Sequence, residues 1–251
     1  MTTRIMTYNV HSCVGVDKRL DVARIAAVIA QSKPDIVALQ ELDVGRLRTG
    51  GIDQAHAIAT RLGMAFHFNC AMRVEEEQYG DAILTALPMR LVRSGRLPTL
   101  PQVRGLEPRG ALWVAVETAP GVQLQVFNTH FGLAPPEQRK QAACLLGRDW
   151  LGNEACRGPV VLVGDFNATT RYAAYQALAD RLDDAQRALQ RTGRRPRTSP
   201  TFPSRFPMLR IDHVFVGPGV KVLDVHAPNR PLARAASDHL PLVTDIEIKA
   251  R

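Results

Sequence analysis

The segment that most constrains this chain is a short apolar run, residues 160–163, that leads directly into polar residues. Such a run of Val and Leu predicts a strand buried on both faces of a sheet. Gly164 lets the backbone turn at the end of the strand, and Asp165 and Asn167 then share one face of an extended chain. Asp and Asn also favour plain turns, so this segment alone leaves a turn and a functional site as alternatives.

The first part of the chain predicts a strand–helix–strand unit. Apolar residues at helical spacing predict a helix over residues 21–31, which ends before Pro34. Strands predicted over residues 4–10 and 35–41 flank it, so a crossover connection joins them and brings Asn9 and Glu41 to one edge of the sheet. Similar patterns predict strands at residues 65–69, 81–86, 90–97, 110–117, 122–128, 211–216, 220–226 and 240–248, and helices at 53–61, 137–151 and 172–189.

Two charged segments are predicted to be loops. Residues 73–79 carry three consecutive glutamates and are interpreted as a solvated loop that does not bind metal. Residues 191–210 place arginines among Gly, Pro and Ser, a composition typical of loops. We interpret this second segment as a basic rim over an anionic substrate, with a solvated surface loop as the alternative. Its arginines are Arg191, Arg194, Arg195, Arg197, Arg205 and Arg210.

The composition is that of a globular protein with an anionic partner. With 251 residues, 45% of them hydrophobic and 22% charged, the chain is long enough for one large domain or two small ones. The net charge of +8 favours nucleic acid, a phosphorylated metabolite or an anionic membrane surface as partner. A basic protein from an Arg-rich proteome is the alternative, and charge alone does not separate these interpretations.

The cysteines and the N-terminal segment favour a reducing, cytoplasmic location. The four cysteines are far apart and form no Cys-x-x-Cys pair, which argues against structural zinc and a disulfide framework. Residues 4–10 are predicted to form a strand rather than the apolar region of a signal peptide. No apolar run approaches the length of a membrane span.

Polar side chains recur at or beside the ends of the predicted strands. One such residue is usually a cap or a turn former, but a whole set on strands that share sheets indicates a site. Oxygen ligands and histidines without cysteine favour a hard cation, Mg²⁺ or Mn²⁺. Such a cation polarises a phosphate that neutral donors hold. The set comprises Asn9, Glu41, His130, Asp165, Asn167, Asp212, Asp238 and His239.

An ordered series of motifs resembles that of the endonuclease/exonuclease/phosphatase superfamily. Gly-Asp-Phe-Asn and Ser-Asp-His are informative alone, and the ordered set, which spans nearly the whole chain, is highly specific. The resemblance implies an α/β fold, a four-layered α/β sandwich of two stacked mixed β-sheets flanked by helices, with the site at one end. It also implies a single domain over residues 1–251. The motifs lie at residues 7–11, 39–41, 79–83, 128–130, 164–167, 210–213 and 237–241.

The resemblance also implies roles for these residues. Glu41 would be the principal metal ligand, with Asn9 beside it and Asp238 at the same or a second metal position. His239, oriented by Asp212, would be the general base or a phosphate donor. For Asn9 and Asp212 the alternative is a buried hydrogen-bonding residue that holds strand ends together.

The remaining residues of the set would contact water and phosphate. Asp165 and Asn167 would position the attacking water and a phosphate oxygen, and His130 would donate to the phosphoryl oxygens. Arg109 is a further candidate for binding substrate phosphate, with a surface salt bridge as the alternative. Tyr79 is a weaker candidate.

Several positions depart from the family pattern. Asp81 stands where many members have Asn, which predicts a more negative local charge. His11 replaces an acidic residue of the abasic-site endonucleases and, like His213 and His226, is interpreted as an ordinary strand-end or surface residue. The chain lacks a tryptophan-rich stretch before residue 211, and Trp113 and Trp150 are expected outside the rim. Abasic-site cleavage is therefore disfavoured.

Together these features predict a metal-dependent phosphoesterase that uses activated water. The expected substrate is a phosphodiester, either a lipid head group or a small phosphorylated molecule. A non-specific endo- or exonuclease on DNA or RNA is the alternative, and a non-catalytic anion-binding module is less well supported. Peripheral contact with an anionic membrane through the basic face is a further expectation. No obligate protein partner is evident.

Overall fold

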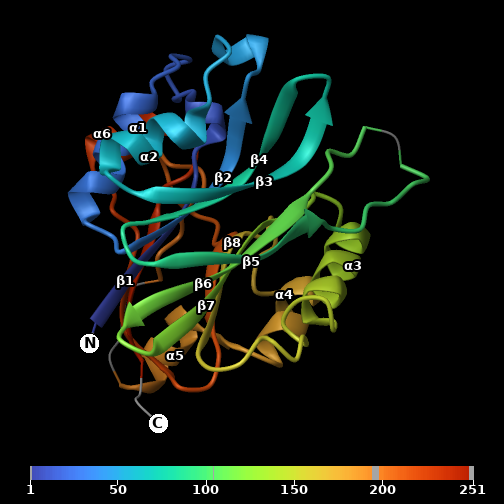
Figure 1. The fold of residues 1–251 in the computed structure, drawn as a ribbon, viewed down its shortest axis with the longest axis vertical. Coiled ribbons are helices and arrows are strands. Elements are labelled where there is room, and N and C mark those ends of the chain that lie inside the picture. The colour runs from blue at the N-terminus through green and yellow to red at the C-terminus, as the bar shows by residue number, and fades with distance from the viewer. Residues whose placement is uncertain (1, 104, 194–197, 249–251) are drawn as a thin grey trace.

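The computed structural model describes residues 2–103, 105–193 and 198–248. Two six-stranded sheets pack face to face, and helices cover their outer faces (Figure 1). This arrangement confirms the predicted four-layered α/β sandwich.

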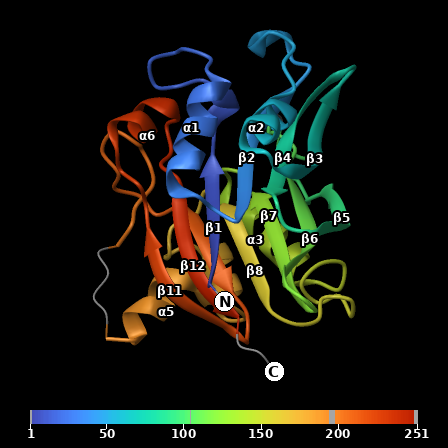
Figure 2. The same ribbon diagram turned by 60° about the vertical axis from the view of Figure 1, so that its left-hand side comes forward.

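The first sheet contains the strands nearest to both ends of the chain. Its strand order is β11-β12-β1-β2-β4-β3, and β1 and β2 run parallel while the other neighbours are antiparallel (Figure 2). The strands are β1 (Thr2–Asn9), β2 (Ile36–Val44), β3 (Ala65–Val74), β4 (Glu77–Thr85), β11 (Val220–His226) and β12 (Leu242–Ile248).

The second sheet is built in the same way from the middle of the chain. Its order is β5-β6-β7-β8-β10-β9, and its single parallel pair is β7 with β8. The strands are β5 (Met89–Arg96), β6 (Gly110–Ala119), β7 (Val122–His130), β8 (Val160–Asp165), β9 (Asp183–Asp184) and β10 (Asp212–Val216).

Short helices cover the sheets, and some of them begin at capping residues that the sequence provides. The side chain of Asp21 accepts a hydrogen bond from Arg24 N, and Asp53 caps the next helix in the same way. No helix in the described part of the chain is long and apolar enough to cross a membrane. The helices are α1 (Val22–Ser32), α2 (Gln54–Leu62), α3 (Pro135–Leu146), α4 (Ala173–Ala179), α5 (Ala185–Arg191) and α6 (Pro231–Ala236), with 3-10 turns η1 (His11–Cys13) and η2 (Leu47–Thr49).

The apolar run of β8 is buried on both of its faces, as predicted. Val161 and Val163 belong to the core between the two sheets. Val160 and Leu162 point the other way, into the core between the second sheet and its helices. A strand in such a position has no solvent-facing side, which explains its continuous apolar sequence.

Strand register brings the polar strand ends to one end of the sandwich. Asn9 at the end of β1 pairs with Gln40 of the parallel strand β2. In the second sheet, Asp165 at the end of β8 pairs with both His130 and Asp212. The carboxyl ends of the two parallel strand pairs therefore lie in the same region of the molecule.

Three predicted segments differ from the structure. Residues 73–79, predicted as a loop, belong mostly to β3 and β4, which form a long hairpin that turns at Glu75 and Glu76. Its outer part is exposed, so the charged residues do not prevent pairing. The helix predicted over 137–151 ends at Leu146, before Gly147. The helical pattern of 172–189 divides into α4 and α5, with the two-residue strand β9 between them.

Candidate active site

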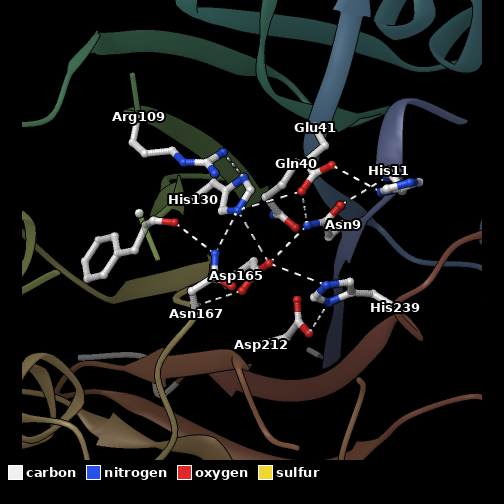
Figure 3. Close-up of polar contacts among 12 residues, drawn as sticks. Asn9, His11, Gln40, Glu41, Arg109, His130, Asp165, Asn167, Asp212 and His239 are labelled. Carbon is white, nitrogen blue, oxygen red and sulfur yellow. Dashed lines mark hydrogen bonds and ion pairs between the residues drawn. The ribbon is translucent and has the colours of Figure 1, made fainter. Parts of the chain in front are cut away.

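Polar side chains from both sheets meet at one end of the sandwich (Figure 3). Most of them line a pocket of about 470 Å³, and Asn9 and Asp212 lie behind it in direct contact with the lining residues. The structure therefore brings together every metal, catalytic and substrate residue that the sequence predicted. The lining members are Glu41, Arg109, His130, Asp165, Asn167, Asp238 and His239.

Glu41 projects into the pocket from an irregular point of β2. The register of β2 against β4 shifts between Leu39 and Leu42. Glu41 itself has a φ angle of 61°, which is uncommon for a residue with a side chain. Burial raises the pKa of its carboxyl group, but other contacts, led by the one with His11, outweigh this and hold the pKa below its ordinary value. Glu41 is therefore ionised and suited to bind a cation.

His11 belongs to the site, and its interpretation as an ordinary strand-end residue is wrong. Its Nδ1 atom lies 3.6 Å from Glu41 Oε2 and 3.6 Å from Asp238 Oδ1. The contact with Glu41 raises the pKa of His11, against the opposing effect of burial. The imidazole therefore lies between two acidic groups that favour its protonated form. The sequence does contain a signal for this role, because His11 lies two residues after Asn9 in the first motif.

Asn9 connects the carboxylates of the two sheets. Its Nδ2 donates to Glu41 Oε1 at 2.9 Å and to Asp165 Oδ2 at 3.0 Å. Its Oδ1 accepts a hydrogen bond from the backbone N–H of His11. Since the amide presents its donor side to the carboxylates, this geometry favours a positioning role over the predicted metal ligation.

Asp165 occupies the centre of the site. Its Oδ1 accepts a hydrogen bond from Asn167 N at 2.9 Å. Its Oδ2 lies 3.5 Å from His130 Nε2 and 3.7 Å from His239 Nε2. Burial, together with the nearby charge of Asp212, raises the pKa of Asp165 to about 7. Asp165 can therefore exchange a proton near neutral pH.

The contact between Asp212 and His239 expected from the resemblance is present. His239 Nδ1 lies 2.8 Å from Asp212 Oδ2, and the Thr201 hydroxyl donates to the same oxygen. Burial lowers the pKa of His239, but the carboxylates of Asp212 and Asp165 outweigh this and raise it to about 10. His239 is therefore an imidazolium that directs Nε2–H towards Asp165.

Arg109 fixes the proton of His130. Arg109 Nη2 pairs with Glu107 Oε2 at 3.1 Å, so the predicted ion pair forms, but Arg109 is only 6% exposed and also faces the site. Its Nη1 lies 3.0 Å from His130 Nδ1, and a guanidinium can only donate. Nδ1 must therefore accept, which leaves the ring proton on Nε2. Burial, and next the charge of Arg109, lower the pKa of His130 well below its ordinary value, so the ring is neutral.

Asn167 places a second donor against that same Nε2–H group. Its Nδ2 donates to Phe131 O at 3.0 Å and lies 3.1 Å from His130 Nε2. A neutral imidazole has one acceptor nitrogen, which Arg109 already occupies. The two N–H groups therefore face each other without a shared acceptor. An anionic oxygen that lies to one side, within hydrogen-bonding distance of both nitrogens, would accept from both.

Asp81 does not add the negative charge that the sequence predicted. Its side chain is buried beside Asn69 on the neighbouring strand, and burial raises its pKa to about 8. At neutral pH the group is mainly protonated. It therefore resembles, in charge, the Asn that many family members carry there.

Two groups of residues could hold a divalent cation. Asp165, Asp212 and His239 form one, with ligand atoms within 4.8 Å of one another. A cation there must displace the proton that His239 holds. Glu41 and Asp238 form the other, and there a cation would replace the contacts with His11. Carboxylate oxygens fit Mg²⁺ or Mn²⁺, so the residues present are compatible with the predicted cation and the second group is favoured.

Among the described arginines of the arginine-rich segment, two pair with carboxylates and do not form the predicted basic rim. Arg191 pairs with Asp183 at 2.7 Å, and Arg210 makes two hydrogen bonds to the buried carboxylate of Asp184. Arg205 is exposed. The remaining arginines, Arg194, Arg195 and Arg197, lie outside the described residues.

The other residues singled out in the sequence lie away from the pocket lining or support it. His213 is buried and its Nε2 lies 2.8 Å from Ala168 O, so it supports the loop that follows β8. His226 is a surface residue paired with Asp224, as predicted. Trp113 and Trp150 are buried beneath the second sheet, outside the rim, as predicted. Tyr79 contacts Arg109 through its hydroxyl group.

A four-layered α/β sandwich with carboxylates, amides and histidines at its strand ends defines a class of hydrolase folds that act on phosphoesters. The chain belongs to the endonuclease/exonuclease/phosphatase family, whose model matches residues 6–239. Members of this family are hydrolases and include phosphatases and nucleases.

Individual relatives match nearly the full length of the chain. The uncharacterized protein YbhP of Escherichia coli K12 is 27% identical over 259 residues, covering 98% of this chain and 96% of YbhP. The mannosyl-6-phosphatase of Bacteroides thetaiotaomicron is 20% identical, with a TM-score of 0.77, and 98% and 100% of the two chains are covered. The human nocturnin catalytic domain with bound sulfate is 20% identical, with a TM-score of 0.72 and coverage of 99% and 95%. These two structures share the fold.

Proposed function

We propose that this protein is a phosphoesterase that requires Mg²⁺ or Mn²⁺ and hydrolyses a phosphodiester. The observation that carries the proposal is the pair of facing donors, Asn167 Nδ2 and His130 Nε2, 3.1 Å apart and backed by Arg109. Two preorganised N–H groups that lack a common acceptor suit an oxygen on which charge develops. The sulfate bound to the nocturnin domain, which has the same fold, supports a tetrahedral oxyanion as ligand.

The remaining residues divide the work of the reaction. Glu41 and Asp238 would hold the cation, which supplies Lewis-acid polarisation of a phosphoryl oxygen when bound. Asp165 holds the attacking water and takes its proton, while the water oxygen bonds to phosphorus and the bond to the leaving oxygen breaks. His239 stabilises the developing charge through Nε2–H, because its raised pKa makes it a donor rather than a base.

The test is hydrolysis of a water-soluble aryl phosphodiester, an aryl phosphomonoester and plasmid DNA in parallel. Each substrate is offered with Mg²⁺, Mn²⁺ or EDTA to the wild type and to His239→Ala. We expect cleavage of the diester with metal, none with EDTA, and a loss of roughly 10²–10⁴-fold in the variant. A folded wild type that cleaves no phosphoester with either metal would contradict the proposal.

A nuclease is the second candidate, favoured by the net charge of +8. It predicts metal-dependent nicking of the plasmid that is lost in His239→Ala. A phosphomonoesterase, as in the named activity of the Bacteroides relative, predicts preference for the monoester. If the protein is a non-catalytic anion-binding module, none of the three substrates should be hydrolysed. A cytoplasmic location and peripheral contact through the basic face remain expectations from the sequence.

A further inference from the structure

We propose that this protein docks on an anionic lipid surface through a group of apolar side chains beside its pocket, and that its substrate is an amphiphilic phosphoester. The identity of the reaction rests on the proposed function, whereas the docking rests on separate observations. We call this group the apolar rim. It consists of Leu133, Tyr172, Phe206, Met208 and Leu209.

The apolar rim is unusually exposed. Leu133, Phe206 and Met208 expose 71%, 76% and 75% of their surfaces, and Tyr172 and Leu209 are also exposed. A single exposed apolar residue needs no explanation, but a group of them beside a pocket marks an interaction site. Transfer of such side chains from water to an apolar phase is favourable in proportion to the area removed from water.

The apolar rim is continuous with the candidate active site. Leu133, Tyr172 and Leu209 line the same pocket as Glu41 and His239. Leu209 also lines a neighbouring cavity of about 290 Å³, to which Met208 contributes. A molecule whose phosphate occupies the site therefore meets apolar side chains with its adjoining part.

A firmly bonded hairpin, residues 201–209, presents most of the apolar rim. Thr201 N donates to Leu209 O at 3.0 Å, and Leu209 N donates to Phe202 O at 2.8 Å. Met208 N donates to the same carbonyl at 3.0 Å. These bonds fix the backbone, so Phe206 at the turn and Met208 beside it project from a supported element.

The base of this hairpin is attached to the candidate active site. Ser204 N donates to Asp238 O at 2.6 Å, and the Ser204 hydroxyl donates to Ser237 O at 2.7 Å. The ring of Phe202 packs 4.9 Å from that of His239. A molecule that contacts the turn of this hairpin is therefore held in a fixed position relative to the reacting groups.

Charges at the apolar rim match an anionic surface. Arg205 lies in the hairpin turn and Arg171 directly precedes Tyr172, and both are exposed. Apolar side chains flanked by arginines suit the boundary between head groups and acyl chains of an anionic membrane. Three of the five side chains of the apolar rim, Leu133, Met208 and Leu209, are aliphatic and do not stack on bases, which favours lipid over single-stranded nucleic acid as the occupant.

Vesicle binding tests the docking surface directly. Vesicles of phosphatidylglycerol and phosphatidylcholine, and of phosphatidylcholine alone, are cosedimented with the wild type, with F206S/M208S and with Leu91→Ser. Leu91 is an exposed leucine on the edge strand β5 and serves as the matched control. We expect wild type and Leu91→Ser to bind the anionic vesicles, and F206S/M208S to bind at least tenfold more weakly. Equal binding of wild type and F206S/M208S would overturn the proposal.

A fluorescent variant, Phe206→Trp, tests insertion of the tip. Trp113 and Trp150 are 1% and 2% exposed, so their emission provides a constant background. We expect a blue shift of the Phe206→Trp emission with anionic vesicles and none in buffer. Emission that stays unshifted on vesicles that bind the protein would show that the tip remains in water and would overturn the proposal.

Activity assays separate this proposal from the proposed function. F206S/M208S should hydrolyse the water-soluble diester within twofold of the wild type, but a phosphodiester carried in anionic vesicles at least tenfold more slowly. If the wild type cleaves no soluble ester yet binds vesicles through the apolar rim, the proposed phosphoesterase function is contradicted and the proposed docking on lipid is supported. If F206S/M208S loses plasmid nicking while its vesicle binding is unchanged, the occupant is nucleic acid and the lipid proposal fails.

Discussion

At the scale of single residues, Asp81 gives the protein a testable dependence of stability on pH. Its pKa is raised to about 8 by burial, whereas an unfolded Asp has its ordinary pKa near 4. Between these values the folded state holds a proton that the unfolded state has released. The contribution of Asp81 to stability is therefore full at low pH and is lost as pH rises through 8.

Asp81→Asn removes this titration while keeping a neutral polar group. We compare the free energy of unfolding of the variant with that of the wild type at each pH. Between pH 5 and pH 8.5 this difference should shift in favour of the variant by at least about 1 kcal/mol, since one pKa unit corresponds to that free energy. Urea unfolding of both proteins at both pH values, in EDTA, measures the difference. An identical effect of the substitution at both pH values would show that Asp81 is ionised in the folded protein.

Glu41 allows the two candidate cation groups to be distinguished without an activity assay. Binding at 100 times the dissociation constant stabilises a folded protein by about 2.7 kcal/mol, so saturating Mg²⁺ or Mn²⁺ should raise the melting temperature. Glu41→Gln should lose this shift, and Glu76→Gln, on the exposed β3–β4 turn, should retain it. Retention of the full shift in Glu41→Gln would place the cation in the group of Asp165, Asp212 and His239 instead.

At the scale of elements, β8 depends on Gly164 for its packing against β7. A Cβ atom at this position would lie 1.9 Å from Thr129 O, and the φ angle is 149°. We expect Gly164→Ala to destabilise the protein by roughly 1–3 kcal/mol or more through overpacking. Gly63→Ala, at a left-handed position with open space around it, should cost about 1 kcal/mol through backbone strain alone. Urea unfolding measures the loss of stability in both variants. Equal losses would show that close packing at β8 adds nothing to the cost of the substitution.

Elements were predictable from the sequence where burial dictates a regular pattern. The strand β8 is apolar throughout because it faces a core on each side, and α1 follows from helical spacing and its cap at Asp21. The outer β3–β4 hairpin was missed because exposed strands carry no such pattern. The short helix α6 and the two-residue strand β9 were missed because so few residues leave no readable period.

Most members of the candidate site were predictable from the sequence, but most of the contacts among them were not. The motifs identify Glu41, Asp165 and His239, and strand register explains why they meet. The position of His11 depends on the 3-10 turn that follows β1, and the neutral state of Asp81 depends on burial, which the sequence pattern does not reveal. The apolar rim was also not foreseen, since exposure of Phe206 depends on how the 201–209 hairpin folds.

At the scale of the whole molecule, the site exists only because the two sheets are held together. Buried Asn128 of β7 donates to Leu39 O and Ala82 O of the first sheet, each at 2.9 Å, and accepts from Gln40 Nε2 at 2.7 Å. Close by, Asn9 reaches Asp165 across the same interface. Polar bridges of this kind fix the relative position of the sheets, and therefore of the facing catalytic groups, more specifically than apolar packing alone.

The net charge of +8 gives a last prediction at this scale, because it should steer anionic substrates towards the protein. The Debye length shortens from about 10 Å at 0.1 M salt to about 3 Å at 1 M. We expect kcat/KM for the soluble diester to fall about three- to tenfold over this range, with kcat little changed. Arg205 lies at the turn of the hairpin whose residues Phe202 and Leu209 line the pocket. Arg205→Gln should therefore flatten the salt dependence more than Arg90→Gln, an equal loss of charge on β5. Equal slopes in the two variants would show that total charge, rather than the arginine at the hairpin turn, attracts the substrate.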